Sequence, residues 1–150
     1  MPHTYTDVLI HFIFSTKDRA PLLVTEIRPE VIGYVGGIVR ELKGSPLSIN
    51  AVADHVHALI RMPSDVSCAE MMRVVKTNSS RWVHEQWPQQ QSFAWQTRYG
   101  AFSVSESNLD QVREYIARQE EHHKNMTFQE EFVAFLKRHN VEYDPKYVWE

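Results

Sequence analysis

Residues 47–62 read LSINAVADHVHALIRM, which are two short apolar runs with only Asp54 between them. Runs of this length, rich in branched aliphatic residues, indicate β-strands, and we place these at 47–53 and 55–62. The two runs could form a tight hairpin or one longer bent strand. In either case they predict a sheet at the centre of the fold.

The second of these strands carries a pair of histidines. His55 and His57 flank Val56, and side chains two apart on a strand point to the same face. Two neutral imidazoles that project together are good metal ligands. A His-x-His pair in a strand is more often an ordinary polar face, so the pair alone leaves both interpretations open.

Outward from this segment, apolar periodicity and start signals predict the remaining elements. They are strands at 5–14 and 99–104, and helices at 25–43 (capped by Thr25), 68–87 (opened by Ser67), 107–123 (capped by Ser107) and 127–139. The order β-α-β-β-α-β-α predicts an α+β fold, a ferredoxin-like α/β sandwich. In it an antiparallel sheet has helices on one face, and a C-terminal helix is added.

Composition sets the broad class. The chain has 150 residues and one cysteine, which predicts a single domain over 1–150 without an internal disulfide. We find no signal peptide and no membrane-spanning run, so a cytoplasmic location is expected. The net charge of −3 is unusual for a nucleic-acid binder, but residues 106–150 carry ten acidic and six basic residues. The excess acidity therefore lies at the C-terminal end, which permits a basic groove elsewhere.

A tyrosine and a glutamine share one face of the helix predicted at 107–123. Tyr115 and Gln119 are four residues apart, so their side chains are neighbours. They lie beside the apolar stripe of that helix, which is formed by Leu109, Val112 and Ile116. A tyrosine at such an edge is more often a packing residue with a hydrated hydroxyl than a catalytic one.

Three basic residues, Arg73, Lys76 and Arg81, fall close to one face of the helix at 68–87. Their spacing fits a solvated helix surface, and it also fits a face that contacts DNA phosphates.

Longer strings of the sequence resemble a known family. DHVHALIRMP at 54–63 resembles the His-hydrophobic-His motif of HUH endonucleases. WQTRYGAFSVSESNLDQVREYIARQEEHH at 95–123 resembles the catalytic region of TnpA-like HUH tyrosine transposases of small bacterial insertion sequences, and the ending at 128–149 is similar to the tail of that family.

This resemblance implies a role for each site residue. His55 and His57 would bind a divalent metal, Mg²⁺ or Mn²⁺, with Gln119 as the third ligand, although imidazoles also suit Zn²⁺. Tyr115 would attack a phosphodiester of single-stranded DNA and form a covalent 5′-phosphotyrosine, which allows the cut strand to be rejoined without ATP.

The resemblance also implies the partners. These are single-stranded DNA with hairpin ends and a second copy of the chain, in a homodimer whose sheet could be extended by an edge strand such as 5–14 or 99–104. Three alternatives remain open: a relative that acts on chromosomal palindromic repeats, a domesticated protein that binds DNA hairpins without cutting them, and a metalloprotein unrelated to DNA.

Overall fold

A four-stranded antiparallel sheet forms the centre of the structure, a computed structural model that describes residues 4–149. Its strands are β1 (Leu9–Ser15), β2 (Ser45–Ala51), β3 (His55–Arg61) and β4 (Gly100–Val104), in the order β2-β3-β1-β4. The helices are α1 (Arg28–Glu41), α2 (Cys68–Gln86), α3 (Leu109–Ala117), α4 (Gln119–His122) and α5 (Phe128–Arg138), with short 3-10 turns at η1 (Lys17–Arg19), η2 (Pro88–Gln90) and η3 (Glu106–Asn108). This strand order, with helical crossovers from β1 to β2 and from β3 to β4, is ferredoxin-like, and the predicted fold class is confirmed.

The strands β2 and β3 form a tight hairpin, so the first of the two sequence alternatives is correct. The backbone N–H of Val52 donates to the carbonyl of His55 across the turn, at 3.1 Å. One strand expectation is wrong: β1 is central, because it is hydrogen-bonded to both β3 and β4. It therefore cannot extend the sheet to a second subunit, whereas β4 does lie at an edge.

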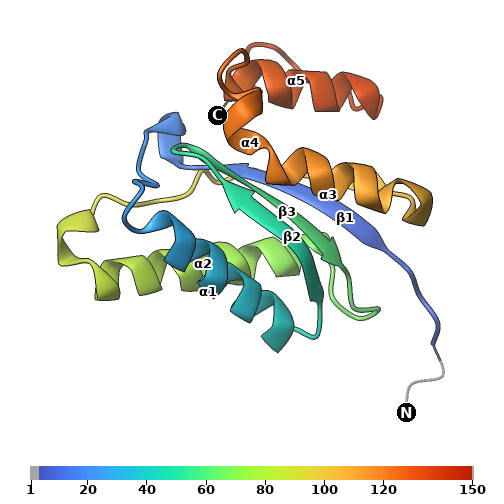
Figure 1. The fold of residues 1–150 in the computed structure, drawn as a ribbon, viewed down its shortest axis with the longest axis horizontal. Coiled ribbons are helices and arrows are strands. Elements are labelled where there is room, and N and C mark those ends of the chain that lie inside the picture. Colours follow the sequence, from blue (N-terminus) through green and yellow to red (C-terminus); the bar gives the residue numbers. More distant parts are fainter. Residues whose placement is uncertain (1–3, 150) are drawn as a thin grey trace.

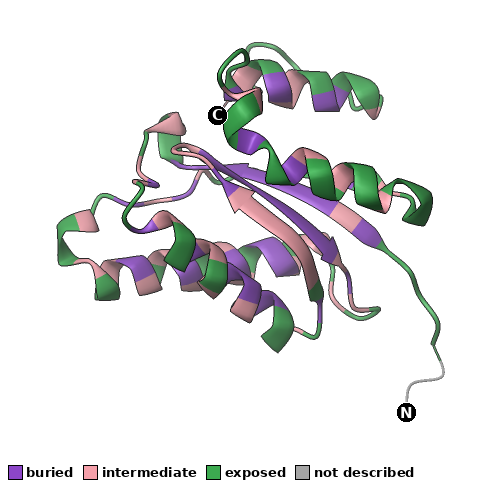
Figure 2. Cartoon of the chain, in the orientation of Figure 1, coloured by how far each residue is buried: buried purple, intermediate pink, exposed green. Residues whose placement is uncertain are grey.

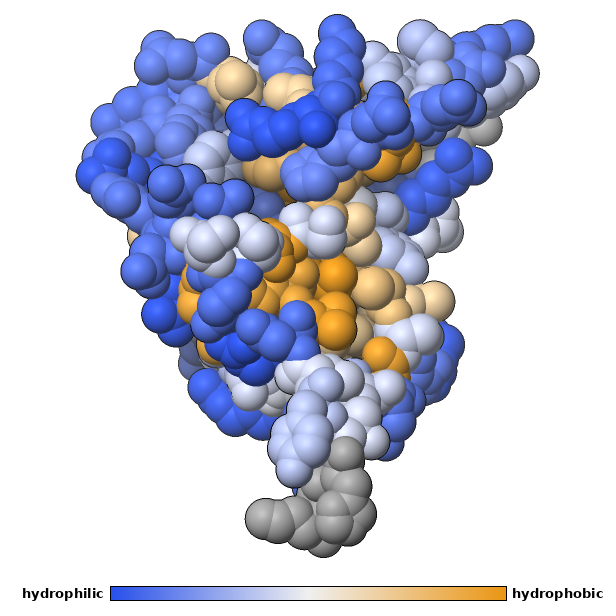
Figure 3. Space-filling model, turned by 90° about the vertical axis from the view of Figure 1, so that its right-hand side faces the viewer, coloured by the Kyte–Doolittle hydropathy of each residue, from blue (hydrophilic) through white to orange (hydrophobic). Residues whose placement is uncertain are grey.

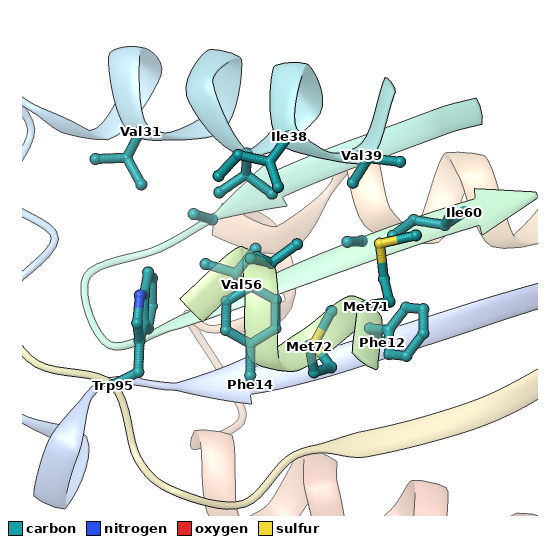
Figure 4. Packing of buried hydrophobic residues seen from close by; sticks show 14 of the residues in the cluster. Phe12, Phe14, Val31, Ile38, Val39, Val56, Ile60, Met71, Met72 and Trp95 are labelled. Atoms are coloured by element: carbon teal, nitrogen blue, oxygen red, sulfur yellow. The ribbon is translucent and has the colours of Figure 1, made fainter. Parts of the chain in front are cut away.

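Helices cover both faces of the sheet (Figure 1). The crossover helices α1 and α2 share one face, as predicted, and α3, α4 and α5 lie on the other. Because neighbouring residues on a strand point to opposite faces, Phe12, Phe14 and Val56 pack under α1 and α2 in the main core (Figure 4). The alternate positions face α3–α5. Most residues of β1 and β3 are consequently buried from both sides (Figure 2).

Helix boundaries follow only some of the predicted caps. Ser67 caps α2 by accepting a hydrogen bond from the N–H of Glu70, as expected. Thr25 does not cap α1, which begins at Arg28. Ser107 lies inside the turn η3, where its hydroxyl pairs with that of Ser105 instead of capping α3.

The helix predicted over 107–123 is broken at Arg118, whose φ of −101° and ψ of 27° are not helical. The break separates α3, which carries Tyr115, from α4, which begins with the fully buried Gln119. Helix propensity is a weak preference that tertiary packing overrides, and here Gln119 is packed beneath the surface.

Apolar side chains gather in the middle of one face of the molecule, with hydrophilic side chains above and below them (Figure 3). Among residues 4–149, no helix is long and apolar enough to cross a membrane.

Candidate active site

The two histidines of β3 point toward α3–α5, on the face of the sheet opposite the main core. In the register of the sheet, His57 is paired with Ile13 and His55 with Ser15 of β1. The pair does not form an ordinary polar face exposed to solvent, since both imidazoles are 0 % exposed. The C-terminal helices, which sequence spacing alone could not place, cover them.

Glu131 of α5 occupies the centre of the site. Its Oε1 atom lies 3.2 Å from Nε2 of His55, 2.8 Å from Nε2 of His57 and 3.1 Å from Nε2 of His123. The carboxylate is only 1 % exposed. Sequence reasoning missed both Glu131 and His123. The available signal was Glu131 itself, which falls in the buried stripe of α5 between Phe128 and Phe135.

In each of the three imidazoles, the ring nitrogen that faces away from Glu131, Nδ1, contacts another residue. Nδ1 of His55 lies 2.7 Å from a carboxylate oxygen of Asp54, and Nδ1 of His123 lies 2.7 Å from the carbonyl of Met126. Nδ1 of His57 lies 2.7 Å from Nε2 of His11, a buried residue of β1. All three Nε2 atoms are therefore directed at Glu131.

Burial and the carboxylate have opposite effects on these groups. Burial lowers the pKa of His57 to about 4, and Glu131 only partly offsets it. Burial also lowers the pKa of His55, but the hydrogen bond with Asp54 and the nearby carboxylate of Glu131 outweigh it and the net pKa is raised. For Glu131, burial raises the pKa, and the surrounding imidazoles of His123, His55 and His57 lower it well below its usual value. The carboxylate is therefore ionised at neutral pH.

The structure brings Tyr115 to this group. Its hydroxyl donates a hydrogen bond to Oε2 of Glu131, and its ring stacks on His122 with 4.2 Å between centroids. Burial, together with the bond to Glu131, raises the pKa of the phenol well above its usual value. The tyrosine is thus protonated and is joined to the histidine pair through a single carboxylate.

Gln119, the third metal ligand expected from the family resemblance, is also buried next to Tyr115. Its side-chain Nε2 donates to the backbone carbonyl of Tyr115 at 3.4 Å, and its Oε1 is buried without a hydrogen-bond partner. This oxygen can therefore accept a hydrogen bond or bind a cation.

A pocket of about 210 Å³ opens beside Tyr115. It is lined by His11, Asn108, Gln111, Val112, Tyr115, Phe135 and Arg138. Arg138 contributes a positive charge to this lining, and that charge acts to lower the pKa of the Tyr115 phenol.

Arg73, Lys76 and Arg81 lie on α2, across the sheet from the histidines, so the structure does not bring them to the tyrosine. Lys76 is partly buried and donates to the carbonyls of Gln96 and Arg98, at 2.7 and 2.8 Å. Burial lowers its pKa to about 8. Arg73 pairs with Glu70, and Arg81 donates to Asn78.

The residues present fit a divalent metal. His55, His57, His123 and Glu131 each offer one ligand atom, and all four atoms lie within 4.8 Å of one another. Nε2 of His55 is buried without a hydrogen-bond partner, as a ligand atom with a free lone pair would be. Imidazole nitrogen and carboxylate oxygen are both ordinary ligands of divalent transition metals.

Comparisons with known proteins agree with this picture. Among solved structures, a candidate transposase from Deinococcus radiodurans R1 superposes with a TM-score of 0.64, at 21 % identity over 79 % of this chain and 95 % of the other. A REP-associated tyrosine transposase bound to a REP hairpin superposes with a TM-score of 0.59, at 16 % identity over 82 % of this chain and 73 % of the other. Curated proteins gave no match. The family model described as "Transposase IS200 like" matches residues 4–119, which include both histidines, Tyr115 and Gln119. This chain belongs to the family of IS200-like transposases.

Proposed function

We propose that this transposase cuts and rejoins single-stranded DNA by forming a covalent bond between Tyr115 and a 5′ phosphate. The observation that carries the proposal is the hydrogen bond between the Tyr115 hydroxyl and Glu131, whose other oxygen contacts the histidine pair. A tyrosine that served only for packing would have no reason to meet a buried carboxylate surrounded by imidazoles.

The reaction exchanges one phosphoester for another. The Tyr115 Oη atom attacks phosphorus, and the bond between phosphorus and the 3′ oxygen breaks. The upstream fragment leaves with a free 3′ hydroxyl, and the downstream fragment stays joined to Tyr115 through its 5′ phosphate. The phenol must lose its proton in this step, and Oε2 of Glu131 already accepts a hydrogen bond from it. Because the energy of the broken ester is kept in the phosphotyrosine, attack by another 3′ hydroxyl can reverse the step without ATP.

His55 and His57 would hold a divalent metal, and the family resemblance adds Gln119 to them. Once bound, such an ion would polarise the phosphoryl oxygen and offset the charge that develops on it. Asp54 and His11 keep the two imidazoles directed into the site. Mg²⁺ and Mn²⁺ are the ions predicted from the sequence.

The proposed substrate is single-stranded DNA with a hairpin. The REP-associated neighbour was solved with a REP hairpin, and this supports the expectation from the family resemblance. The pocket beside Tyr115, with the positive charge of Arg138, is where we place the scissile phosphate. Arg73, Lys76 and Arg81 remain predicted phosphate contacts, remote from the tyrosine, that a hairpin stem could reach.

Trapping of the covalent intermediate tests the proposal. A single-stranded hairpin oligonucleotide labelled at its 3′ end is incubated with protein and Mn²⁺, and the products are separated under denaturing conditions. Label should migrate with the wild-type protein and with Tyr147→Phe, a control at an exposed tyrosine. It should not migrate with Tyr115→Phe, which removes the nucleophile and little contact area.

Two outcomes contradict the proposal. An adduct with Tyr115→Phe would mean that another residue is the nucleophile. Hairpin binding by the wild-type protein without any adduct, in every divalent metal tried, would support the alternative of a hairpin-binding protein that does not cut. A protein that binds metal but shows no salt-dependent DNA affinity would instead be a metalloprotein unrelated to DNA.

A further inference from the structure

The hydrogen bonds at the Nδ1 atoms of His55 and His123 show which ring nitrogens carry protons. Nδ1 of His55 faces the Asp54 carboxylate, and Nδ1 of His123 faces the Met126 carbonyl. Both of these partners can only accept, so both Nδ1 atoms must donate. In a neutral imidazole the other nitrogen, Nε2, then has a lone pair.

These lone pairs converge on another electron-rich atom. Nε2 of His55 and Nε2 of His123 lie 3.2 and 3.1 Å from Oε1 of Glu131. Such an arrangement of lone pairs in a buried site is unfavourable unless a cation lies among them. The contact between His55 and Glu131 does not have hydrogen-bond geometry, since Nε2 of His55 is left without a partner. A proton on Nε2 of His123 would donate to Oε1 of Glu131, but Nε2 of His55 would still have no partner. A metal ion satisfies all of these atoms.

The spacing of the atoms agrees with this. The three distances from the imidazole nitrogens to Oε1 of Glu131 are 3.2, 2.8 and 3.1 Å. Neighbouring ligands in a tetrahedral site with bonds of about 2.0–2.1 Å are separated by about 3.3 Å. The distances to Oε1 are thus close to this value, and all four ligand atoms lie within 4.8 Å of one another.

We propose that His123 and Glu131 of the C-terminal segment join His55 and His57 as ligands of the metal centre. The proposal rests on the proposed function, because it concerns the same site. It makes α5 part of the catalytic centre. It also places a metal ligand, Glu131, in direct contact with the nucleophile, since Oε2 of this carboxylate accepts the hydrogen bond from Tyr115.

The ligand set also selects the ion. Three imidazoles and one carboxylate suit metals of borderline softness, so we expect Zn²⁺ and Co²⁺ to bind more tightly than Mn²⁺. Mg²⁺ prefers oxygen ligands and retains its water, so it should bind weakest. With Gln119 and only two imidazoles, the preference for Zn²⁺ and Co²⁺ over Mg²⁺ would be smaller.

Metal titration of the full chain by calorimetry, without DNA, tests the proposal. We expect Glu131→Gln and His123→Ala to weaken Co²⁺ binding by about 100-fold or more, above the 10–100-fold typical for outer-shell partners. Gln119→Met, which keeps the side-chain volume but removes the oxygen, should weaken Co²⁺ binding less than either Glu131→Gln or His123→Ala. The matched control is Glu130→Gln, next to Glu131 and tolerated in the capping box of α5. It should bind Co²⁺ like the wild type.

The Co²⁺ complex of the unsubstituted protein provides an independent measurement that does not depend on how any variant folds. Four-coordinate Co²⁺ absorbs visible light far more strongly than six-coordinate Co²⁺, and a crystal of the complex would show the ligands directly. We expect the strong spectrum, and density that joins the ion to His123 and Glu131.

Failure of this proposal can be distinguished from failure of the proposed function. If Gln119→Met abolishes binding while Glu131→Gln and His123→Ala do not, the ligand set proposed here is wrong and the transposase chemistry stands. If His55→Ala and His57→Ala also leave the Co²⁺ affinity unchanged, the histidine pair does not bind metal. The ligand set proposed here and the metal dependence of the proposed function are then both wrong. Formation of the DNA adduct is scored separately.

Discussion

Nε2 of His11 lies 2.7 Å from Nδ1 of His57, and neither ring is more than 1 % exposed. On the other side of the ring, Nε2 of His57 lies 2.8 Å from Oε1 of Glu131. A carboxylate can only accept, so in the metal-free protein Nε2 of neutral His57 donates to it. His57 must then accept at Nδ1 from His11. A metal on Nε2 would require the opposite tautomer, in which His57 donates to His11.

His57→Ala should destabilise the metal-free protein. The ring is fully buried and makes hydrogen bonds at both nitrogens, so its removal leaves a cavity and two unsatisfied partners. We expect a loss of about 2–4 kcal/mol in the free energy of unfolding, measured by urea denaturation in the presence of a chelator. A loss below about 0.5 kcal/mol, as for an exposed side chain, would show that the ring is not enclosed as described.

The stability of the metal-free protein should fall as the pH drops below 6.5. Burial lowers the pKa of His57 to about 4 and that of His11 well below its ordinary value of 6.5. Between these values the unfolded chain binds protons at both residues and the folded chain does not, so acid favours unfolding. Each histidine contributes up to about 1.4 kcal/mol per pH unit. His55, whose pKa is raised, affects stability only above about pH 6.5, because below that pH it is protonated in both the folded and the unfolded chain.

Urea midpoints at pH 7 and pH 5.5, in the presence of a chelator, measure this effect. His11→Gln removes one of the two titrating groups, so its stability should depend less steeply on pH than that of the wild type. An equal pH dependence in the two proteins would mean that His11 is not kept neutral by burial.

The sequence predicted the order of elements and the pairing of His55 with His57, because both follow from local periodicity. It could not predict how the C-terminal helices pack, since that depends on contacts between distant residues. Glu131 is 74 positions from its closest imidazole partner, His57. For the same reason, nothing in the sequence indicated that the histidines would be buried, or that Lys76 would donate to backbone carbonyls instead of facing solvent.

Arg138→Ala should slow formation of the adduct. Arg138 and Tyr115 line the same pocket, so the guanidinium can contact a phosphate placed for attack. We expect a decrease of roughly 10–100-fold in the single-turnover rate, somewhat less than for loss of an oxyanion-hole donor. Lys137→Ala, at an exposed neighbouring position, is the control and should react like the wild type. Equal rates for both variants would move the scissile phosphate out of this pocket.

The basic residues of α2 should divide into two classes. Arg73 and Arg81 are exposed, so if the α2 face contacts DNA, replacing either by Ala should weaken hairpin binding and reduce the salt dependence by about one phosphate contact each. Lys76→Met should instead destabilise the fold, because two backbone carbonyls lose their donor. Unchanged binding and salt dependence in an Arg73→Ala/Arg81→Ala double variant would exclude the α2 face as a DNA contact.

A homodimer remains a prediction from the family resemblance, and the structure bears on how its active sites would be built. Tyr115 reaches Glu131 and the histidine pair within one chain, so each subunit can complete its own site. The alternative, in which the tyrosine helix of one subunit serves the histidine pair of the other, would require α3 to leave the face of the sheet. That movement would break the hydrogen bond to Glu131 and two bonds from the Asn50 side chain to the carbonyls of Ile116 and Ala117.

Complementation between two inactive variants distinguishes these arrangements. Tyr115→Phe and His55→Ala/His57→Ala proteins are mixed under conditions that allow subunits to exchange, and the 3′-labelled adduct is measured. If sites form within one chain, as the contacts of Tyr115 favour, every site lacks either the nucleophile or the histidines, and the mixture stays inactive. Recovered adduct would show that tyrosine and histidines come from different subunits. Exchange itself must be verified with a tagged subunit, because an inactive mixture of unexchanged dimers would look the same. Sedimentation of the active wild-type protein as a monomer would remove the dimer prediction and leave assembly within one chain as the only arrangement.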